Sequence, residues 1–284
     1  MSLPLWHYCS DLKPKDMRLK IVLIMWIGMA LLSCNVMGTN YRAVYDFEYT
    51  KDSINSILEK DILYLEISKN SSFCFSYYTY YTDSLKNTPN GRAVWRQLFS
   101  AAIAKDGTNA TSFPYKRSTF MVTKCYTSDT LCIKDMIDND IYEYVASKNE
   151  FHWQLCDSAK NINGFEAYKA TCCYHGREWA VWFSPDIPFS DGPWVFCGLP
   201  GLILEARDKD NLFAFRLKGL VSNQELKKDW LGKGKKTDRI SFLRKDYQYR
   251  KNLTRIFNAE MGANVPENKN DTRYLDGLEP DFKQ

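Results

Sequence analysis

Apolar and polar residues alternate along most of the chain between residues 41 and 218, as they do in half-buried β-strands. Short polar segments separate these stretches, and those at 161–164 and 175–176 are typical of hairpin turns. Many short strands joined by tight turns predict an antiparallel sheet, either curved or closed halfway into a barrel. The predicted strands are 41–50, 62–68, 73–82, 119–126, 130–137, 140–145, 165–174, 177–183, 202–207 and 212–218, with another beginning at His152.

In two stretches the apolar residues do not alternate with polar ones. In residues 92–104 the apolar positions recur at helical spacing and Gly107 follows as a stop, which predicts a short inserted helix. Residues 237–261 carry an apolar stripe among many Lys and Arg residues, which predicts a C-terminal helix. Residues 262–284 are polar and are predicted to be disordered. The predicted fold class is therefore mostly β (α+β), with one antiparallel β domain over 39–236.

The most hydrophobic stretch is IVLIMWIGMALLS at residues 21–33, which carries no charge and follows a pair of basic residues. A basic region before an apolar segment of this length is typical of a signal peptide. Small residues stand at the −3 and −1 positions of a cleavage after Gly38. Residues 1–38 are therefore predicted to be a signal peptide. Met17 directly precedes the basic pair and is an alternative start of the chain.

Three other interpretations of this segment remain open. The sequence LLSC ending at Cys34 resembles a bacterial lipobox, which would make Cys34 a lipidated anchor at the membrane. Extended to Gly38, the apolar stretch has about 18 residues, which is marginal for an uncleaved membrane anchor. A buried core helix is the third. The first two agree with export, to the periplasm or the outer membrane, with membrane contact only if Cys34 is lipidated.

Composition narrows the class of protein. The 284 residues are 45% hydrophobic and 25% charged, which are ordinary values for a globular protein. The 15% of aromatic residues favours strands. A formal net charge of +4 is lower than a nucleic-acid-binding protein usually carries, so no nucleic-acid partner is expected.

Cysteine usage fits an exported chain but predicts no definite disulfide pattern. Export would place the cysteines where disulfides persist. Cys125 and Cys132 flank a predicted turn and could face each other across a hairpin. An odd number of cysteines leaves at least one without a partner within the chain. Those after the signal peptide are Cys74, Cys125, Cys132, Cys156, Cys172, Cys173 and Cys197.

The sequence offers no strong catalytic or metal-binding pattern. No GxSxG is present, and the only cluster of Cys and His is Cys172, Cys173 and His175. A zinc site is disfavoured because there is no CxxC and only three histidines are present. Residues 208–211 lack the 12-residue ligand loop of a calcium site. We therefore expect no cofactor and no metal, and no catalytic residue is assigned.

Residues 184–205, SPDIPFSDGPWVFCGLPGLILE, form a segment rich in proline and glycine that predicts a rigid loop followed by a strand. The four residues from Leu199 to Leu202 suit a type II turn, with proline second and glycine third. The loop either merely closes a hairpin or forms one wall of a binding groove. The candidate ligand-binding residues of that groove are Trp182, Asp186, Trp194, Phe196 and Glu205.

The core of this segment is similar to a known family signature. Gly198, Leu199, Pro200, Gly201, Leu202 and Ile203 spell the motif of the GLPGLI family, exported proteins of Bacteroidota. The resemblance covers about residues 41–225 and implies export and a β-rich fold, but no activity. Ala167 stands where members often carry a cysteine, which puts any family disulfide in doubt. Flanking segments that also resemble the family are 162–165, 169–170, 176–177, 180–183, 186–188 and 192–193.

Three hypotheses for function follow. The leading one is a non-enzymatic binding or accessory protein of the cell envelope, which would hold an apolar or peptide ligand on the concave face of its sheet. The second is a structural or assembly component that contacts another envelope protein. The third is a hydrolase that uses carboxylates near the 184–205 segment, with Asp186 and Glu205 as candidates.

Overall fold

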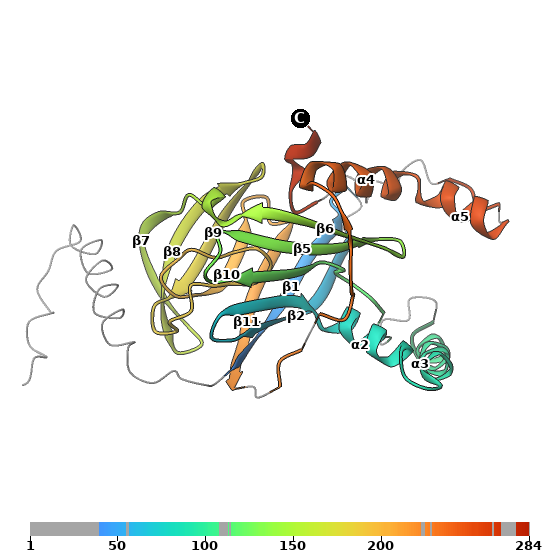
Figure 1. Cartoon of the computed structure of the whole chain (residues 1–284), viewed down its shortest axis with the longest axis horizontal. Helices are drawn as coiled ribbons and strands as arrows, with labels where there is room; N and C mark the ends of the chain where they lie inside the picture. The colour runs from blue at the N-terminus through green and yellow to red at the C-terminus, as the bar shows by residue number, and fades with distance from the viewer. Residues whose placement is uncertain are drawn as a thin grey trace, which may run out of the picture.

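Twelve strands form one continuous, curved sheet in the computed structural model (Figure 1). The structure describes residues 40–54, 57–107, 113, 115–222, 225–227, 229–262, 264–267 and 277–283. The predicted signal peptide, with Met17, Cys34 and Gly38, lies outside these residues. Within the part of the chain that the structure describes, no helix is both long and apolar enough to span a membrane.

The sheet is open, because its order starts at β12 and ends at β7. The full order is β12-β6-β5-β4-β3-β2-β1-β11-β10-β9-β8-β7, and every pair is antiparallel except β12 with β6. The strands are β1 (Tyr41–Asp52), β2 (Ile57–Ile67), β3 (Ser71–Ser76), β4 (Met121–Cys125), β5 (Thr130–Ile137), β6 (Asp140–Ser147), β7 (Gln154–Ile162), β8 (Phe165–Tyr174), β9 (Arg177–Ser184), β10 (Leu202–Asp208), β11 (Phe213–Ser222) and β12 (Lys235–Lys236).

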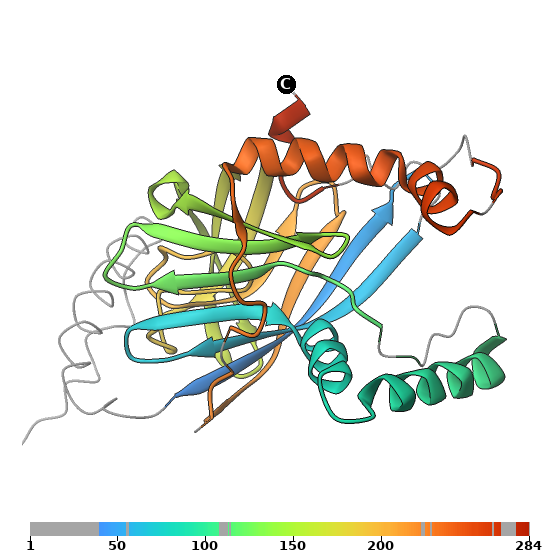
Figure 2. The same cartoon turned by 45° about the vertical axis from the view of Figure 1, so that its right-hand side comes forward.

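The helices lie outside the curve of the sheet or across one end of it. α4 lies across that end, whereas α3 projects away from the sheet (Figures 1 and 2). The helices are α2 (Tyr77–Lys86), α3 (Gly91–Asp106), η4 (Lys148–Glu150), α4 (Arg239–Lys251), α5 (Leu253–Met261) and η5 (Pro280–Lys283). The predicted fold class, mostly β with an inserted helix and a C-terminal helix, is confirmed.

One predicted strand is partly a helix. The sequence analysis extends a strand over 73–82, but β3 ends at Ser76 and α2 follows at once. The Ser76 hydroxyl accepts a hydrogen bond from the Thr79 amide at 3.2 Å and donates one to Asp61 at 2.9 Å. Serine in this position caps a helix, because it satisfies an amide that has no partner in the first turn. The cap, supported by this contact with the neighbouring strand β2, thus overrides the β-propensity of the tyrosines that follow.

The C-terminal region also differs from the prediction. The single helix expected over 237–261 is two helices, separated at Asn252, whose φ of −103° and ψ of 12° are not helical. Residues 277–283 belong to the segment predicted to be disordered, yet they pack on the body of the protein and bury Phe282 to 8% exposure. Residues 262–284 are mostly polar, so their composition did not indicate that Phe282 is buried.

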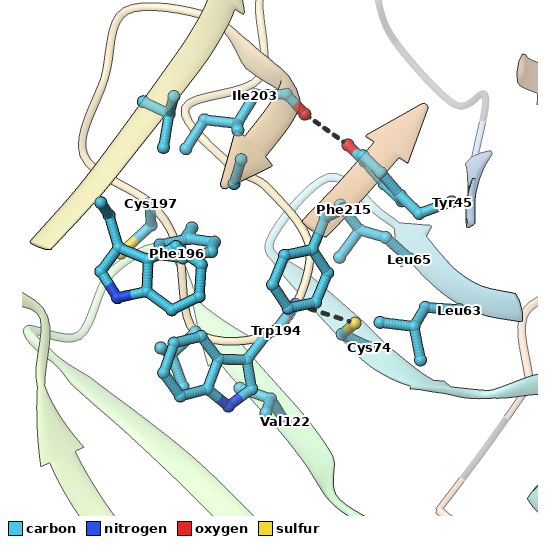
Figure 3. Packing of buried hydrophobic residues seen from close by; sticks show 14 of the residues in the cluster. Tyr45, Leu63, Leu65, Cys74, Val122, Trp194, Phe196, Cys197, Ile203 and Phe215 are labelled. Atoms are coloured by element: carbon cyan, nitrogen blue, oxygen red, sulfur yellow. Dashed lines mark hydrogen bonds between the residues drawn. The ribbon is translucent and has the colours of Figure 1, made fainter. Parts of the chain in front are cut away.

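The interior of the curve is filled by inward-facing side chains and by the loop between β9 and β10. In Figure 3, Trp194 and Phe196 from this loop lie among side chains of the surrounding strands, close to Phe215. The Trp194 amide donates to Cys74 Sγ at 3.2 Å, and the Tyr45 hydroxyl donates to the Ile203 carbonyl at 2.7 Å (Figure 3). The loop therefore closes the β9–β10 connection and also forms part of the core.

A buried ion pair fixes the loop in place. Lys124 on β4 and Asp191 in the loop are 1% and 0% exposed, and Lys124 Nζ lies 2.6 Å from Asp191 Oδ1. Lys124 also donates to the carbonyls of Gly192 and Phe196 at 2.6 and 2.8 Å. The Tyr126 hydroxyl donates to the second Asp191 oxygen at 2.9 Å. Such a charge pair is stable in the interior only because hydrogen bonds satisfy both partners.

The turn at the end of the loop is tighter than the predicted type II turn. The Gly201 amide donates to the Leu199 carbonyl at 2.9 Å, while the Leu202 amide donates to the carbonyl of Ile187 at 3.0 Å. Gly201 has a φ of 147°, and a Cβ atom there would lie 2.1 Å from the Ser184 carbonyl oxygen. Glycine is therefore required by a close approach between two backbone segments.

The cysteines of the described region are free thiols. Cys125 and Cys132, which the sequence allowed to face each other across a hairpin, do not do so, because the β4–β5 register places Thr123 opposite Cys132. Cys172 and Cys173 lie on opposite faces of β8, the first buried and the second exposed.

Candidate functional site: a cavity beneath the C-terminal segment

A cavity of about 350 Å³ opens at the end of the sheet where β1 finishes and β11 begins. Its walls come from β1, β5, β6 and β11, from residues 117–120 before β4, from the β9–β10 loop, from α4 and α5, and from residues 277–282. Figure 2 shows α4 lying across this end of the sheet. The lining residues are Phe47, Tyr49, Thr50, Lys51, Arg117, Ser118, Thr119, Phe120, Ile133, Asp135, Met136, Tyr144, Trp194, Phe213, Phe242, Leu243, Asp246, Arg250, Leu253, Gly277, Leu278, Glu279 and Phe282.

Aromatic side chains line the inner part of the cavity. Phe47 lies 6.4 Å from both Phe120 and Phe213, measured between ring centroids, and Tyr144 stacks on Phe242 at 5.3 Å. These strand residues face inward because side chains alternate between the two faces of a strand. The inner wall is thus apolar and already buried in the protein.

Two carboxyl groups, those of Asp135 and Asp246, also line the cavity. Asp135 Oδ1 accepts hydrogen bonds from Thr119 Oγ1 at 2.6 Å and from the Met136 amide at 2.7 Å. Burial raises the pKa of Asp135 to about 7; the two hydrogen bonds oppose this rise and the charge of Asp246 adds to it. Burial also raises the pKa of Asp246, although Arg250 lies 2.6 Å away and opposes the shift. The cavity therefore contains a carboxyl group that changes charge near neutral pH.

The C-terminal segment that covers the cavity is held by ionic contacts. His175 contacts Glu279 through Nδ1 at 2.8 Å and Glu150 through Nε2. Arg239 on α4 donates to both oxygens of Asp281, at 2.9 and 2.6 Å. Burial lowers the pKa of His175, but its hydrogen bonds to the two glutamates outweigh burial, so the pKa is raised overall. The charged imidazolium is thus the form that binds the segment.

Raising the pH is expected to loosen the C-terminal segment. The pKa of His175 is higher in the folded protein, so its contribution is complete below the unfolded value of about 6.5 and is lost as the pH rises through the folded value. The hydrogen bond from Arg239 lowers the pKa of Asp281, so this second contact of the segment does not change over the same range. Hydrogen-exchange protection of residues 277–283 should therefore fall as the pH is raised from 6 to 9, after correction for the intrinsic exchange rate.

The variant His175→Gln should show low protection at both pH values, whereas the matched variant His152→Gln, at an exposed position, should behave as the unmodified protein. A fall in protection that persists in His175→Gln would show that another group controls the segment.

The predicted ligand-binding residues lie in separate places. Trp182 and Glu205 are cross-strand neighbours on the face of the sheet away from the core. There Lys160 pairs with Glu205 and lies 4.4 Å above the Trp182 ring. Asp186 is exposed in the loop, where its amide donates to Ser184 Oγ at 3.3 Å, whereas Glu205 pairs with Lys160.

The two remaining predicted residues lie on the core side of the sheet. Trp194 lines the cavity, whereas Phe196 is fully buried and does not line it.

Sequence reasoning missed Asp135, Asp246 and Lys124, although two of them carried a signal. Asp135 follows Leu131 and Ile133 at the inward positions of its strand, where an apolar residue is expected. Lys124 likewise comes two residues after the buried Val122, on the same face of β4. A charged residue within an otherwise apolar alternation marks a buried polar contact or a site. Asp246 lies in a helix with many charged residues, so it did not stand out from its neighbours in the sequence.

Residues 174–205 match the model of a family described as "Protein of unknown function (Porph_ging)". The match covers the end of β8, β9, the buried loop and the start of β10. No match is found among curated proteins. In the described region no group of three or more His, Cys, Asp or Glu residues could hold a metal ion.

The chain is also similar to solved structures. A structure of PNGF-II in space group P21 aligns with a TM-score of 0.50 and 10% identity, over 75% of this chain and 34% of that one. The chain thus spans about a third of that protein. A DUF1329 family protein from Desulfovibrio piger ATCC 29098 aligns with a TM-score of 0.30 and 9% identity, over 74% of this chain and 96% of that one. The likeness to PNGF-II concerns the fold alone.

Proposed function

We propose that this is an exported, non-enzymatic binding protein that holds a small apolar ligand in the cavity beneath its C-terminal segment. The observation that carries the proposal is a cavity of about 350 Å³ at the end of the sheet, lined by strand residues, α4 and residues 277–282. The volume falls within the range of small-molecule sites, which are mostly apolar with a few polar groups.

Export is part of the proposal and rests on the sequence. The basic, apolar and small-residue pattern of residues 1–38 supports a signal peptide, with lipidation at Cys34 as the alternative route to the envelope. The resemblance to an exported family supports the same location, in the periplasm or at the outer membrane.

Filling the cavity should abolish ligand binding. Leu243 on α4 lines the cavity, so the substitution Leu243→Trp places a larger side chain in the space for the ligand. N-phenyl-1-naphthylamine, a neutral apolar probe that fluoresces when bound, should bind the unmodified protein with micromolar affinity. We expect Leu243→Trp to weaken this binding at least about tenfold, which corresponds to 1.4 kcal/mol.

The matched control is Leu58→Trp near the start of β2, where Leu58 is 55% exposed and does not line the cavity. This control should bind the probe as the unmodified protein does. The proposal fails if the unmodified protein does not bind the probe, or if Leu243→Trp binds it equally well while remaining folded by circular dichroism.

A further inference from the structure

The cavity has a charge pattern that narrows the class of ligand, and the inference rests on the proposed function. We propose that the cavity selects an amphipathic organic cation, an arylalkyl primary amine. Its ammonium group would be held by Asp135, while its apolar body would lie against the aromatic wall formed by Phe47, Phe120, Trp194 and Phe242.

Charged groups at the open side of the cavity already have partners. Lys51 Nζ lies 2.6 Å from Glu59, and Arg250 lies 2.6 Å from Asp246. Asp135 forms no ion pair with a described residue, and Arg250 acts on it only through its more distant charge. A ligand that carried a negative charge would therefore meet a carboxyl group and two cations that are already neutralised.

The remaining charges of the lining are also engaged. Glu279 contacts His175 at 2.8 Å and Arg239 at 3.6 Å. The guanidinium of Arg117 lies 3.8 Å above the Tyr78 ring and donates to a backbone carbonyl of β2, so it is directed toward α2. Asp135 is thus the carboxyl group of the lining that forms no ion pair with a described residue.

The local environment of Asp135 makes a cationic partner favourable. Both hydrogen bonds that it receives end on Oδ1, while the side chain lines the cavity. An ionised carboxylate in apolar surroundings is costly unless a positive charge accompanies it, so burial raises the pKa of Asp135 to about 7 and the group binds a proton below that pH. A ligand ammonium group would replace that proton, and it would donate hydrogen bonds to the carboxylate as well.

The aromatic lining is suited to the rest of such a ligand. Ring faces attract cations and also pack against apolar groups. Thr119, whose hydroxyl donates to Asp135, and Phe120 both line the cavity, so the carboxyl group and the aromatic wall border the same space. A cavity of about 350 Å³ accommodates a one- or two-ring amine rather than a long lipid or a folded peptide.

Binding should depend on pH in a predictable direction. A proton on Asp135 competes with the ligand, so affinity for an amine should rise as the group ionises. With a pKa of about 7, the ionised fraction increases about tenfold between pH 6 and pH 8. The other titratable or charged groups around the cavity and the helix that covers it are Tyr49, Lys51, Arg117, Tyr142, Tyr144, His175, Arg239, Lys245, Asp246, Arg250 and Glu279.

Calorimetric titration with tryptamine and with tryptophol, its neutral alcohol analogue, tests the proposal. At pH 7.5 the unmodified protein should bind tryptamine at least tenfold more tightly than tryptophol, and this preference should shrink at pH 6. The variant Asp135→Asn should bind both equally, because it keeps the size of the side chain and removes its charge. The matched control Glu205→Gln, on the outer face of the sheet, should retain the preference.

The same variants separate this inference from the proposed function. If Asp135→Asn and the unmodified protein both bind N-phenyl-1-naphthylamine but the unmodified protein does not prefer tryptamine, the cavity binds ligands and the inference of a cation is wrong. Preference for tryptamine that survives in Asp135→Asn also overturns it. If the unmodified protein binds none of the three compounds, both proposals fail.

Discussion

Replacing Lys124 by alanine is expected to lower the free energy of unfolding by about 3–5 kcal/mol, because it leaves Asp191 buried without its cation. The same change removes hydrogen bonds to the carbonyls of Gly192 and Phe196, which hold the loop inside the sheet. Urea denaturation followed by tryptophan fluorescence measures the loss. The double variant Lys124→Met, Asp191→Asn, which removes both charges, should recover part of it.

The control for this prediction is Lys236→Ala, which removes a lysine from an exposed pair with Glu143, where the Lys236 side chain is 77% exposed. Exposed pairs contribute at most about 1 kcal/mol. If Lys124→Ala destabilises the protein no more than Lys236→Ala does, the buried pair is not what fixes the loop.

Replacing Gly201 by alanine is expected to cost about 3 kcal/mol or more, and the soluble yield should fall with it. A non-glycine residue at a left-handed φ costs about 1–3 kcal/mol. Here the new Cβ would also lie 2.1 Å from the Ser184 carbonyl oxygen, so β9 and β10 would have to separate. Thermal unfolding measured by circular dichroism gives the size of the effect.

The comparison for Gly201→Ala is Gly219→Ala on β11, where the added methyl group would meet no atom within 4 Å. That variant should unfold close to the temperature of the unmodified protein. If both variants lower the unfolding temperature equally, the backbone around Gly201 relaxes to accommodate a Cβ atom. The close approach is then not the reason for glycine at this position.

Much of the sheet could be predicted from the sequence, because alternation and turn residues act locally. The strand predicted over 165–174 is β8 to the residue, and the one predicted over 130–137 is β5. The helix α2 could not be predicted in this way. Its start depends on a hydrogen bond between Ser76 and Asp61, which come together only when β2 and β3 pair.

The candidate site was harder to predict, because it exists only where distant segments meet. The acid within the apolar alternation of β5 was visible in the sequence, but nothing local indicated that Asp135 would face a cavity. That depends on α4 and residues 277–283 lying over one end of the sheet. The composition of residues 184–205 indicated a binding loop, yet most of the side chains of this loop fill the interior. Among its aromatic residues, Trp194 lines the cavity.

The central position of β1 has a consequence for how the chain folds. β1 pairs with β2 on one side and with β11 on the other, and Glu48 meets Arg216 across 168 residues of sequence. Closing so long a loop costs chain entropy before any contact offsets it, and such non-local pairing slows folding. During synthesis one edge of β1 stays unpaired until β11 has been made. The two halves of the sheet can therefore pair only after β11, near the end of the β domain, has been synthesised. Until then the nascent chain cannot complete its fold.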